Sequence, residues 1–268
     1  MIDLDALKQY RTLFISDIHL GAKACQAELV LDFLKHNDAD TYYLVGDIVD
    51  FWRIKRGAHW PQSHNDVIQK LLRKARKGSR IIYVPGNHDD SLRSFCGTRF
   101  GGIEVARNWL HESADGRRFL VIHGDEFDVV VRYARWLAFA GDWAYQLALG
   151  LNTKLNWVRR RLDLPYWSLS AYLKHKVKRA VNYMGEFERA IAGHASRHNA
   201  EGVICGHIHH AAIRDLEGVL YMNCGDWVES CTAVCETPDG KFEIIRWTDR
   251  RAQVQSQPRV VTELEAAA

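Results

Sequence analysis

The stretch TLFISDIH, residues 12–19, decides how the fold of this chain begins. Its first five residues form an apolar run, which predicts a short buried β-strand over Thr12–Ser16. Asp17 and His19 follow and are two residues apart, so in an extended backbone their side chains face the same way. The stretch therefore predicts a buried strand that delivers a carboxylate and an imidazole to one edge of a sheet.

The same pattern recurs along the chain. Apolar runs at 41–45, 81–84, 119–122 and 203–205 also predict short strands. Each run is followed by side chains that bind metals, namely Gly46-Asp47, Gly86-Asn87-His88-Asp89, His123-Gly124 and Gly206-His207-Ile208-His209. Ligands of open α/β sheets bind outside the carboxyl ends of the strands. We therefore expect all of these strand ends to meet at a single metal site.

The segments between these strands predict the rest of an α/β fold. Residues 24–36 and 65–77 have helical periodicity. In the second helix we expect Leu71 and Leu72 to face inward, and Arg73, Lys74, Arg76 and Lys77 to face outward. Strands that alternate with helices predict a sheet covered by helices. Three later runs predict antiparallel strands that complete a second sheet, at 219–223, 232–235 and 242–247.

Residues 126–197 differ in character from the chain on either side. They combine helical periods with several tryptophans, which predicts a helical insertion, or lid, between two strands of the core. The core would then consist of residues 1–125 and 198–250. The polar tail, residues 251–268, has no clear period, and we expect it to be loosely ordered.

Composition excludes several classes of protein. A net charge of +3 is too small to imply nucleic-acid binding, so no nucleic-acid partner is expected. The six cysteines form no CxxC pair, and we expect reduced thiols in a cytoplasmic protein. The first residues lack a basic region followed by an apolar run, and no apolar stretch reaches the roughly 18 residues of a membrane span. We therefore expect neither a signal peptide nor a transmembrane helix.

The candidate ligands offer nitrogen and oxygen but no thiolate. This donor set favours Mn, Fe, Zn or Co over Mg or Ca, and we take Mn²⁺ as the first expectation. Two divalent cations, the carboxylates of Asp17 and Asp47 and one bridging hydroxide would leave a net charge of about +1, which suits an anionic phosphoryl group. The sequence therefore favours a phosphate-bearing substrate.

The motifs DxH, GD, GNHD, HG and GHxH, in this order, resemble those of the calcineurin-like metallophosphoesterases. The resemblance spans roughly residues 12 to 236. It implies a two-sheet metallophosphoesterase sandwich flanked by helices, and a hydroxide between two metals that attacks phosphorus. It also implies which residues are ligands: Asp17, His19 and His209 for the first metal, Asn87, His123 and His207 for the second, and Asp47 for both.

The same resemblance gives roles to residues that are not ligands. It places His88 beside the leaving group, as a general acid or an electrostatic stabiliser. Asp89 is then the expected partner that orients His88, because carboxylates often orient histidines. Asp125 and Asp226 are candidates to support the ligands, with simple turn roles as the alternative.

The predicted lid concentrates the basic charge of the chain. Residues 151–200 carry ten basic and three acidic side chains, interleaved with apolar ones. A basic, tryptophan-bearing amphipathic segment is typical of binding to an anionic membrane surface or of a cap over an anionic lipid. The alternative is a solvated basic face on a helix that packs against the core.

A helical lid at this position, together with Gly225-Asp226-Trp227, resembles the UDP-2,3-diacylglucosamine diphosphatases of lipid A synthesis. That resemblance implies cleavage of the pyrophosphate of a UDP-linked diacyl sugar to UMP and lipid sugar 1-phosphate. One departure is that those enzymes typically have arginine where this chain has His88. The expected substrate contacts are Asn87, His88, Trp157, Arg159, Arg160, Trp167 and Leu173, with Arg161 adding surface charge.

Two further functions stay open. His88 favours a soluble phosphodiesterase or phosphatase that acts on another phosphate ester. A non-catalytic scaffold on the same fold is disfavoured, because the full set of expected ligands is present. The expected location is the cytoplasm, with peripheral attachment to the inner membrane if the lid binds lipid, and the sequence leaves the oligomeric state undetermined.

Overall fold

The computed structural model describes residues 7–57, 59–127, 187–188, 191–195 and 197–248. The chain divides into two compact units, one formed by residues 1–124 with 195–268 and the other by residues 125–194. In the second unit the described residues include the short helix η2 (Asp125–Phe127), where Phe127 packs edge-on against Phe187 with ring centroids 6.3 Å apart. Most of the predicted lid and the whole predicted tail lie outside the described residues.

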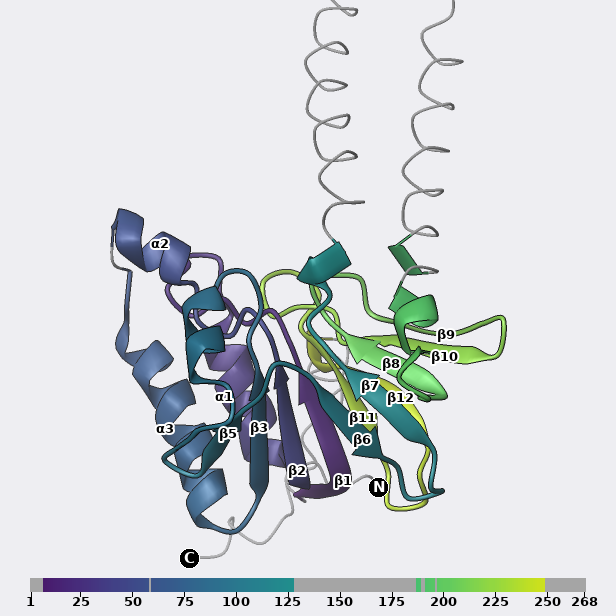
Figure 1. The fold of residues 1–268 in the computed structure, drawn as a ribbon. Helices are drawn as coiled ribbons and strands as arrows, with labels where there is room; N and C mark the ends of the chain where they lie inside the picture. The colour runs from purple at the N-terminus through teal and green to yellow at the C-terminus, as the bar shows by residue number, and fades with distance from the viewer. Residues whose placement is uncertain (1–6, 58, 128–186, 189–190, 196, 249–268) are drawn as a thin grey trace, which may run out of the picture. The chain divides into compact units, whose positions relative to one another are not determined.

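The first unit contains a seven-stranded mixed sheet in the order β12-β11-β1-β2-β3-β5-β4 (Figure 1). Its strands are β1 (Lys8–Ile15), β2 (Asn37–Val45), β3 (Arg80–Val84), β4 (Arg99–Phe100), β5 (Ile103–Val105), β11 (Thr232–Glu236) and β12 (Phe242–Arg246). The central strands β1, β2, β3 and β5 run parallel, whereas β11 pairs antiparallel with β1.

A second sheet of five strands has the order β6-β7-β8-β10-β9. Its strands are β6 (Trp109–Glu112), β7 (Arg118–Val121), β8 (Gly202–Cys205), β9 (Ala212–Leu216) and β10 (Val219–Asn223). The prediction that β10, β11 and β12 together complete this sheet is wrong. Of the three only β10 belongs to it, parallel to β8, while β11 and β12 extend the first sheet. A strand's own sequence shows which of its faces are apolar but not which strand it will pair with.

Alternation along β1 shows why the strands are apolar on both faces. Leu13 and Ile15 pack in the core beneath the helices, and Phe14, which points the other way, packs between the two sheets against Tyr43 and Phe119. A strand that is buried on both faces reads as a continuous hydrophobic run rather than an alternating one. This is why TLFI predicted a buried strand correctly.

Helices cover the outer face of the first sheet (Figure 1). The helices of this unit are α1 (Ala27–His36), α2 (Phe51–Arg56), α3 (Gln62–Arg76) and the short η1 (Asp90–Phe95). Phe33 of α1 and Leu71 of α3 are fully buried in the core beneath them. Two predictions for α3 are wrong. Leu72 is 37% exposed, and Lys74 is buried because its ammonium contacts the Asp38 carboxylate at 3.0 Å.

Two further findings bear on the expectations from composition. Among the described helices none combines the length and the hydropathy that a bilayer crossing requires. All six cysteines are free thiols, and Cys205, Cys224, Cys231 and Cys235 are buried as small apolar groups.

Candidate metal centre

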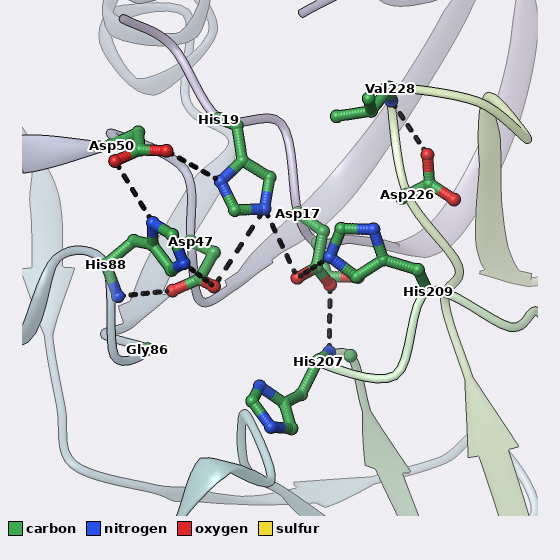
Figure 2. A network of polar contacts seen from close by, with 12 residues as sticks. Asp17, His19, Asp47, Asp50, Gly86, His88, His207, His209, Asp226 and Val228 are labelled. Carbon is green, nitrogen blue, oxygen red and sulfur yellow. Dashed lines mark hydrogen bonds and ion pairs between the residues drawn. The ribbon is translucent and has the colours of Figure 1, made fainter. Parts of the chain in front are cut away.

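The predicted ligands come together beyond the carboxyl ends of strands from both sheets. Asp17 and His19 follow β1, Asp47 follows β2, His123 follows β7, and the pair His207 and His209 follows β8. Figure 2 shows the side chains of Asp17, His19, Asp47 and His209 pointing toward one another. The expectation that all of these strand ends meet at one place is therefore confirmed by the geometry.

The backbone that presents these ligands is not extended, as the spacing argument assumed. Asp17 and His19 have φ angles of 52° and 56°, and Asp47 has 53°. His207 and His209 have 70° and 53°. Residues other than glycine rarely adopt this left-handed conformation, and each costs on the order of 1–3 kcal/mol. The surrounding structure therefore holds these five ligands in left-handed turns at the strand ends.

Hydrogen bonds between neighbouring strand ends hold these turns. The amide of Asp17 donates to the carbonyl of Gly46 at 3.0 Å, and the amide of His19 donates to the carbonyl of Asp47 at 2.9 Å. The amide of His207 donates to Asp17 Oδ2 at 2.9 Å. The parallel ladder thus continues past the regular strands, and it locks the left-handed residues against one another.

Glycines leave the space that the centre needs. A Cβ atom at Gly86 would collide with Asp47 Oδ1 and with the ring of His123. At Gly46, where φ is 75°, it would collide with the same ring. A Cβ at Gly206 would lie 2.5 Å from Asp17 Oδ2. The GD, GN and GH pairs of the sequence are therefore required by close packing against the ligands.

One group of potential ligand atoms comprises Asp17, His19 and His209, and these atoms lie within 4.8 Å of one another. His209 Nε2 is 3.2 Å from Asp17 Oδ1, and His19 Nε2 is 3.8 Å from the same oxygen. Asp17 is fully buried, whereas the side chain of His209 is 40% exposed. This group opens to solvent on the side of His209.

A second group comprises Asp47, His123 and His207, again within 4.8 Å. His123 Nε2 lies 3.4 Å from Asp47 Oδ2. The same oxygen is 3.9 Å from His19 Nε2, so Asp47 stands between the two groups (Figure 2). His123 Nδ1 lies 3.0 Å from the carbonyl oxygen of Val45, which fixes the ring with Nε2 toward Asp47.

The residues present fit a pair of divalent cations. Asn87 Oδ1 and His19 Nε2 are buried and have no hydrogen-bond partner among the residues that the structure describes. Buried polar atoms are normally satisfied, so such atoms beside two carboxylates mark a place for a cation. The oxygen and nitrogen donors suit Mn, Fe, Zn or Co, as the sequence predicted.

Asp50 is a member of the centre that the sequence argument missed. It follows β2 and caps α2, where its side chain accepts a hydrogen bond from the amide of Arg53 at 2.8 Å. Its two oxygens also contact two histidines, His19 Nδ1 at 3.3 Å and His88 Nδ1 at 3.0 Å. The signal in the sequence was the spacing GDxxD, which places a second carboxylate one turn after Asp47.

His88 therefore has a different partner from the one predicted. Its Nε2 faces the centre, 4.0 Å from Asp47 Oδ2, and Asp50 rather than Asp89 holds its Nδ1 (Figure 2). The amide of His88 donates to Asp47 Oδ1 at 2.8 Å, which ties its turn to the centre. Trp52 covers the outer side of the imidazole, with ring centroids 4.3 Å apart.

Asp89 points into the protein instead. The Tyr83 hydroxyl and the amides of Gly86, Ile48 and Val49 all donate to its carboxylate. These bonds join the end of β3 to the segment after β2. Asp89 therefore fixes the position of the GNHD turn relative to the segment after β2, because its carboxylate accepts hydrogen bonds from backbone amides and from Tyr83.

Charge in the centre shifts several pKa values. Burial alone would raise the pKa of Asp47, but His123, His19 and His88 hold it well below its ordinary range. Burial would lower the pKa of His88, but the carboxylates of Asp50 and Asp47 raise it above its ordinary value. Burial and the charge of Asp47 raise the pKa of Asp89, in keeping with its inward position.

The remaining predicted site residues fall into two classes. Asp226 adopts the turn role, because its Oδ1 accepts from the amides of Val228, Glu229 and Ser230. Asp125 belongs to the other compact unit. The predicted lid contacts all lie outside the described residues: Trp157, Arg159, Arg160, Arg161, Trp167 and Leu173.

Comparison with known proteins agrees with this geometry. The family model for calcineurin-like phosphoesterases matches residues 10–211. The UDP-2,3-diacylglucosamine hydrolase of Neisseria gonorrhoeae is 30% identical over 80% of this chain and 88% of its own length. The protein of that name from Aeromonas salmonicida is 27% identical over 87% and 92%.

A solved phosphoesterase structure from E. coli is 16% identical, with a TM-score of 0.45 over 89% of this chain and 93% of that one. The family match covers well over half of the chain and contains every predicted ligand. This protein therefore belongs to the calcineurin-like phosphoesterase family and is a metal-dependent phosphoester hydrolase.

Proposed function

We propose that this protein hydrolyses the pyrophosphate bond of a UDP-linked diacyl sugar, giving UMP and the lipid sugar 1-phosphate. The observation that carries the proposal is a chain of overlapping ligand groups in which His19 and Asp47 are shared between neighbouring groups, since such a double site suits cleavage of a phosphoric anhydride. The choice of substrate is supported by the relatives named UDP-2,3-diacylglucosamine hydrolase, which align with most of the chain.

In this proposal each donor has a place. Two divalent cations, with Mn²⁺ as the first candidate, would polarise the phosphoryl group and lower the pKa of a water between them. Asp17, His19 and His209 would hold one cation, and Asp47 would contact both. The other cation would be held by Asn87, His123 and His207. The glycines at the strand ends keep this space open.

His88 would assist departure of the leaving group. When the imidazole is protonated on both nitrogens, its Nδ1–H faces Asp50 and its Nε2–H faces the centre, where the proton is available to a leaving group. The nearby carboxylates favour the protonated ring, and this suits either donation of a proton or stabilisation of negative charge. Asp89 would act only by holding the turn that carries Asn87 and His88.

We further propose a cytoplasmic location at the inner membrane, consistent with six free thiols. The basic segment at residues 151–200 would face lipid, with Trp157, Trp167 and Leu173 in contact with acyl chains. Exchange of Arg159, Arg160 and Arg161 for glutamine should then weaken binding to anionic vesicles and leave hydrolysis of a small diester unchanged.

A second candidate function is a soluble phosphodiesterase or phosphatase. His88 favours it, because a histidine held by a carboxylate beside two metal ligands suits proton transfer to many kinds of leaving group. Nothing in the described centre requires a lipid. A non-catalytic scaffold has little support, because the geometry brings the predicted ligands together.

A substrate panel with added Mn²⁺ distinguishes these functions. It compares UDP-2,3-diacylglucosamine, UDP-sugars without acyl chains, cyclic nucleotides and p-nitrophenyl esters, with the Asp47→Asn protein as the control for contaminating phosphatases. The proposal predicts the highest kcat/KM for the diacyl substrate and release of UMP. Faster hydrolysis of the unacylated compounds would instead establish the soluble phosphodiesterase or phosphatase.

A further inference from the structure

The helix α2 and the segment after it form an unusual surface beside the metal centre. We call it the α2 surface and define it by its exposed side chains, Trp52, Arg53, Lys55, Arg56 and Trp60. No residue of α2 is fully buried, although the helix contains Phe51 and Ile54. A helix without buried residues adds little to a hydrophobic core, so its role must lie in the groups that it contacts or in the surface that it exposes.

Contacts at its base fix α2 firmly to the centre. The Asp50 carboxylate caps it, and the amide of Phe51 donates to the carbonyl of His88 at 3.1 Å. Ile54 packs so closely on Gly21 that a Cβ there would lie 2.7 Å from Ile54 Cγ1. These contacts use the inner side of the helix and leave the opposite side outward.

The cations of this surface have no acidic partner among the residues that the structure describes. Arg53, Lys55 and Arg56 form no ion pair with any residue in the described part of the chain. The segment 51–60 contains no acidic residue. The nearest acid in sequence, Asp50, is buried and engaged by His19 and His88. Three uncompensated cations suit an anionic surface.

The two tryptophans point to a lipid surface rather than to a soluble anion. Trp52 is 44% exposed and Trp60 is 36% exposed, whereas the other tryptophans within the described residues are more buried. An exposed tryptophan beside lysine and arginine is typical of segments that lie in the headgroup region of a bilayer. The ring of Trp52 also lies 4.3 Å from that of His88, so this surface borders the catalytic groups.

We infer that the α2 surface seats the protein on an anionic phospholipid bilayer next to its metal centre. The inference rests on the proposed function, because a substrate with two acyl chains stays anchored in a bilayer while its pyrophosphate reaches Asp47. The site must then open close to the lipid headgroups, and α2 is the described element that joins the turn of His88. Binding here is independent of the basic segment at residues 151–200.

The test measures binding of the full-length protein to sedimented vesicles. Phosphatidylcholine vesicles with and without phosphatidylglycerol are compared at low and high salt. The variant Arg53→Gln/Lys55→Gln/Arg56→Gln removes the cations of the α2 surface. The matched control, Arg73→Gln/Arg76→Gln/Lys77→Gln, removes three exposed cations from the end of α3. A second pair compares Trp60→Ala with Phe100→Ala, which truncates an aromatic side chain exposed elsewhere.

We expect the parent protein to bind only the anionic vesicles. The α2 variant should lose affinity by up to on the order of 100-fold at low salt, since each cation near such a surface contributes about fivefold. High salt should shrink the difference. The α3 control and Phe100→Ala should bind like the parent, and Trp60→Ala should bind more weakly.

Three results would overturn the inference. They are no binding by the parent, equal losses in the α2 and α3 variants, or a loss confined to changes at Arg159, Arg160 and Arg161. Hydrolysis of bis(p-nitrophenyl) phosphate is followed in parallel and should be the same in all variants. If the parent does not hydrolyse UDP-2,3-diacylglucosamine, the proposed function fails, whatever the vesicles show. If hydrolysis persists and vesicle binding is absent, only the α2 inference fails.

Discussion

Two clusters of carboxylates and histidines lie along β1, and the chain uses them in opposite ways. The metal centre follows the carboxyl end of the strand. The other cluster lies at the middle of the strand, and we call it the Glu236 clamp, formed by Arg11, Thr12, His111, Ala114 and Glu236. Both clusters contain deeply buried carboxylates, so burial alone does not distinguish a functional site from a structural one.

In the Glu236 clamp each group has a partner. Arg11 Nη1 contacts one carboxylate oxygen at 2.7 Å, and the amide of Ala114 donates to the same oxygen at 2.8 Å. The Thr12 hydroxyl donates to the other oxygen at 2.8 Å, and His111 Nε2 lies 2.9 Å from it. These contacts join β1 and β11 of one sheet to β6 of the other. Both oxygens of the Glu236 carboxylate are thus occupied by partners within the protein, and we assign the clamp a structural role.

The metal centre lacks this closure. His19 Nε2 and Asn87 Oδ1 are left without hydrogen bonds among the described residues, and five of the seven predicted ligands have left-handed backbone. The clamp residues have ordinary backbone within or beside strands. Buried polar atoms without hydrogen-bond partners, close to strained turns, therefore indicate a ligand site. Buried polar groups on regular strands whose hydrogen bonds are all made within the protein indicate a structural role.

Asp47→Asn should have the largest effect on function. Asparagine keeps the shape of the side chain and tolerates positive φ, so the change removes mainly the charge shared between the two ligand groups. Loss of an outer-shell partner alone typically costs 10–100-fold, and we expect a loss of more than about 10³-fold in kcat together with lower metal content. Metal analysis beside steady-state kinetics checks this. Two full equivalents of metal in an inactive variant would contradict the assignment.

His88→Ala should lower turnover by roughly 10²–10⁴-fold and leave metal content near that of the parent. The imidazole also groups with His19 and Asp47 as a possible ligand, so unchanged metal content would show that only proton transfer or charge stabilisation is lost. The loss should shrink for p-nitrophenyl esters, whose leaving group needs no proton. Rates for esters with good and poor leaving groups are compared, and equal losses would argue against the acid role.

Glu236→Ala should affect stability rather than chemistry. His111 is buried and would lose its carboxylate partner, whereas Arg11 is 35% exposed and keeps the carbonyl of Glu112 as an acceptor, so we expect a cost of about 1–3 kcal/mol. Urea unfolding measures the free energy of unfolding, while metal content and kcat at 20 °C should stay close to those of the parent. A loss of metal without a loss of stability would show that the Glu236 clamp supports the metal centre rather than the fold.

Asp50→Asn should reduce activity by about 10–100-fold. Asp50 contacts the Nδ1 atoms of His19 and His88, whose Nε2 atoms face the centre, so it acts on the reaction only through these two histidines. Both His19 and His88 lose a charged partner, so metal affinity and kcat should fall together. A metal titration of the variant at several Mn²⁺ concentrations separates the two effects. Asp89→Asn is the comparison, and it should act through stability because Asp89 bonds to backbone and Tyr83.

The smallest effect concerns pH. Burial alone would raise the pKa of Glu236, but hydrogen bonds from His111, Ala114 and Thr12 lower it below its ordinary value. A depressed folded-state pKa means that its contribution to stability is present above the unfolded pKa and is lost as the pH falls through the folded pKa. The free energy of unfolding should therefore fall below about pH 4.5 less steeply in Glu236→Gln than in the parent. Identical slopes would show that Glu236 is not ionised in the clamp.

The sequence determined the local features of this protein. Apolar runs such as TLFI predicted the strands because side chains on both faces of a strand must be buried. The donors that follow each run could be assigned to one site because parallel strands end at the same edge of a sheet. Each of these conclusions needs only a few consecutive residues and the direction of the strand.

Tertiary structure alone decided the features that depend on distant contacts. β11 and β12 joined the first sheet, and His111 met Glu236 across 125 positions of the chain. The left-handed turns of Asp17 and Asp47 are fixed by bonds between neighbouring strand ends, so no local preference could reveal them. For the same reason Asp50, rather than Asp89, became the partner of His88. The direction in which a carboxylate points depends on the hydrogen-bond donors that the fold brings close to it, and these donors come from other segments of the chain.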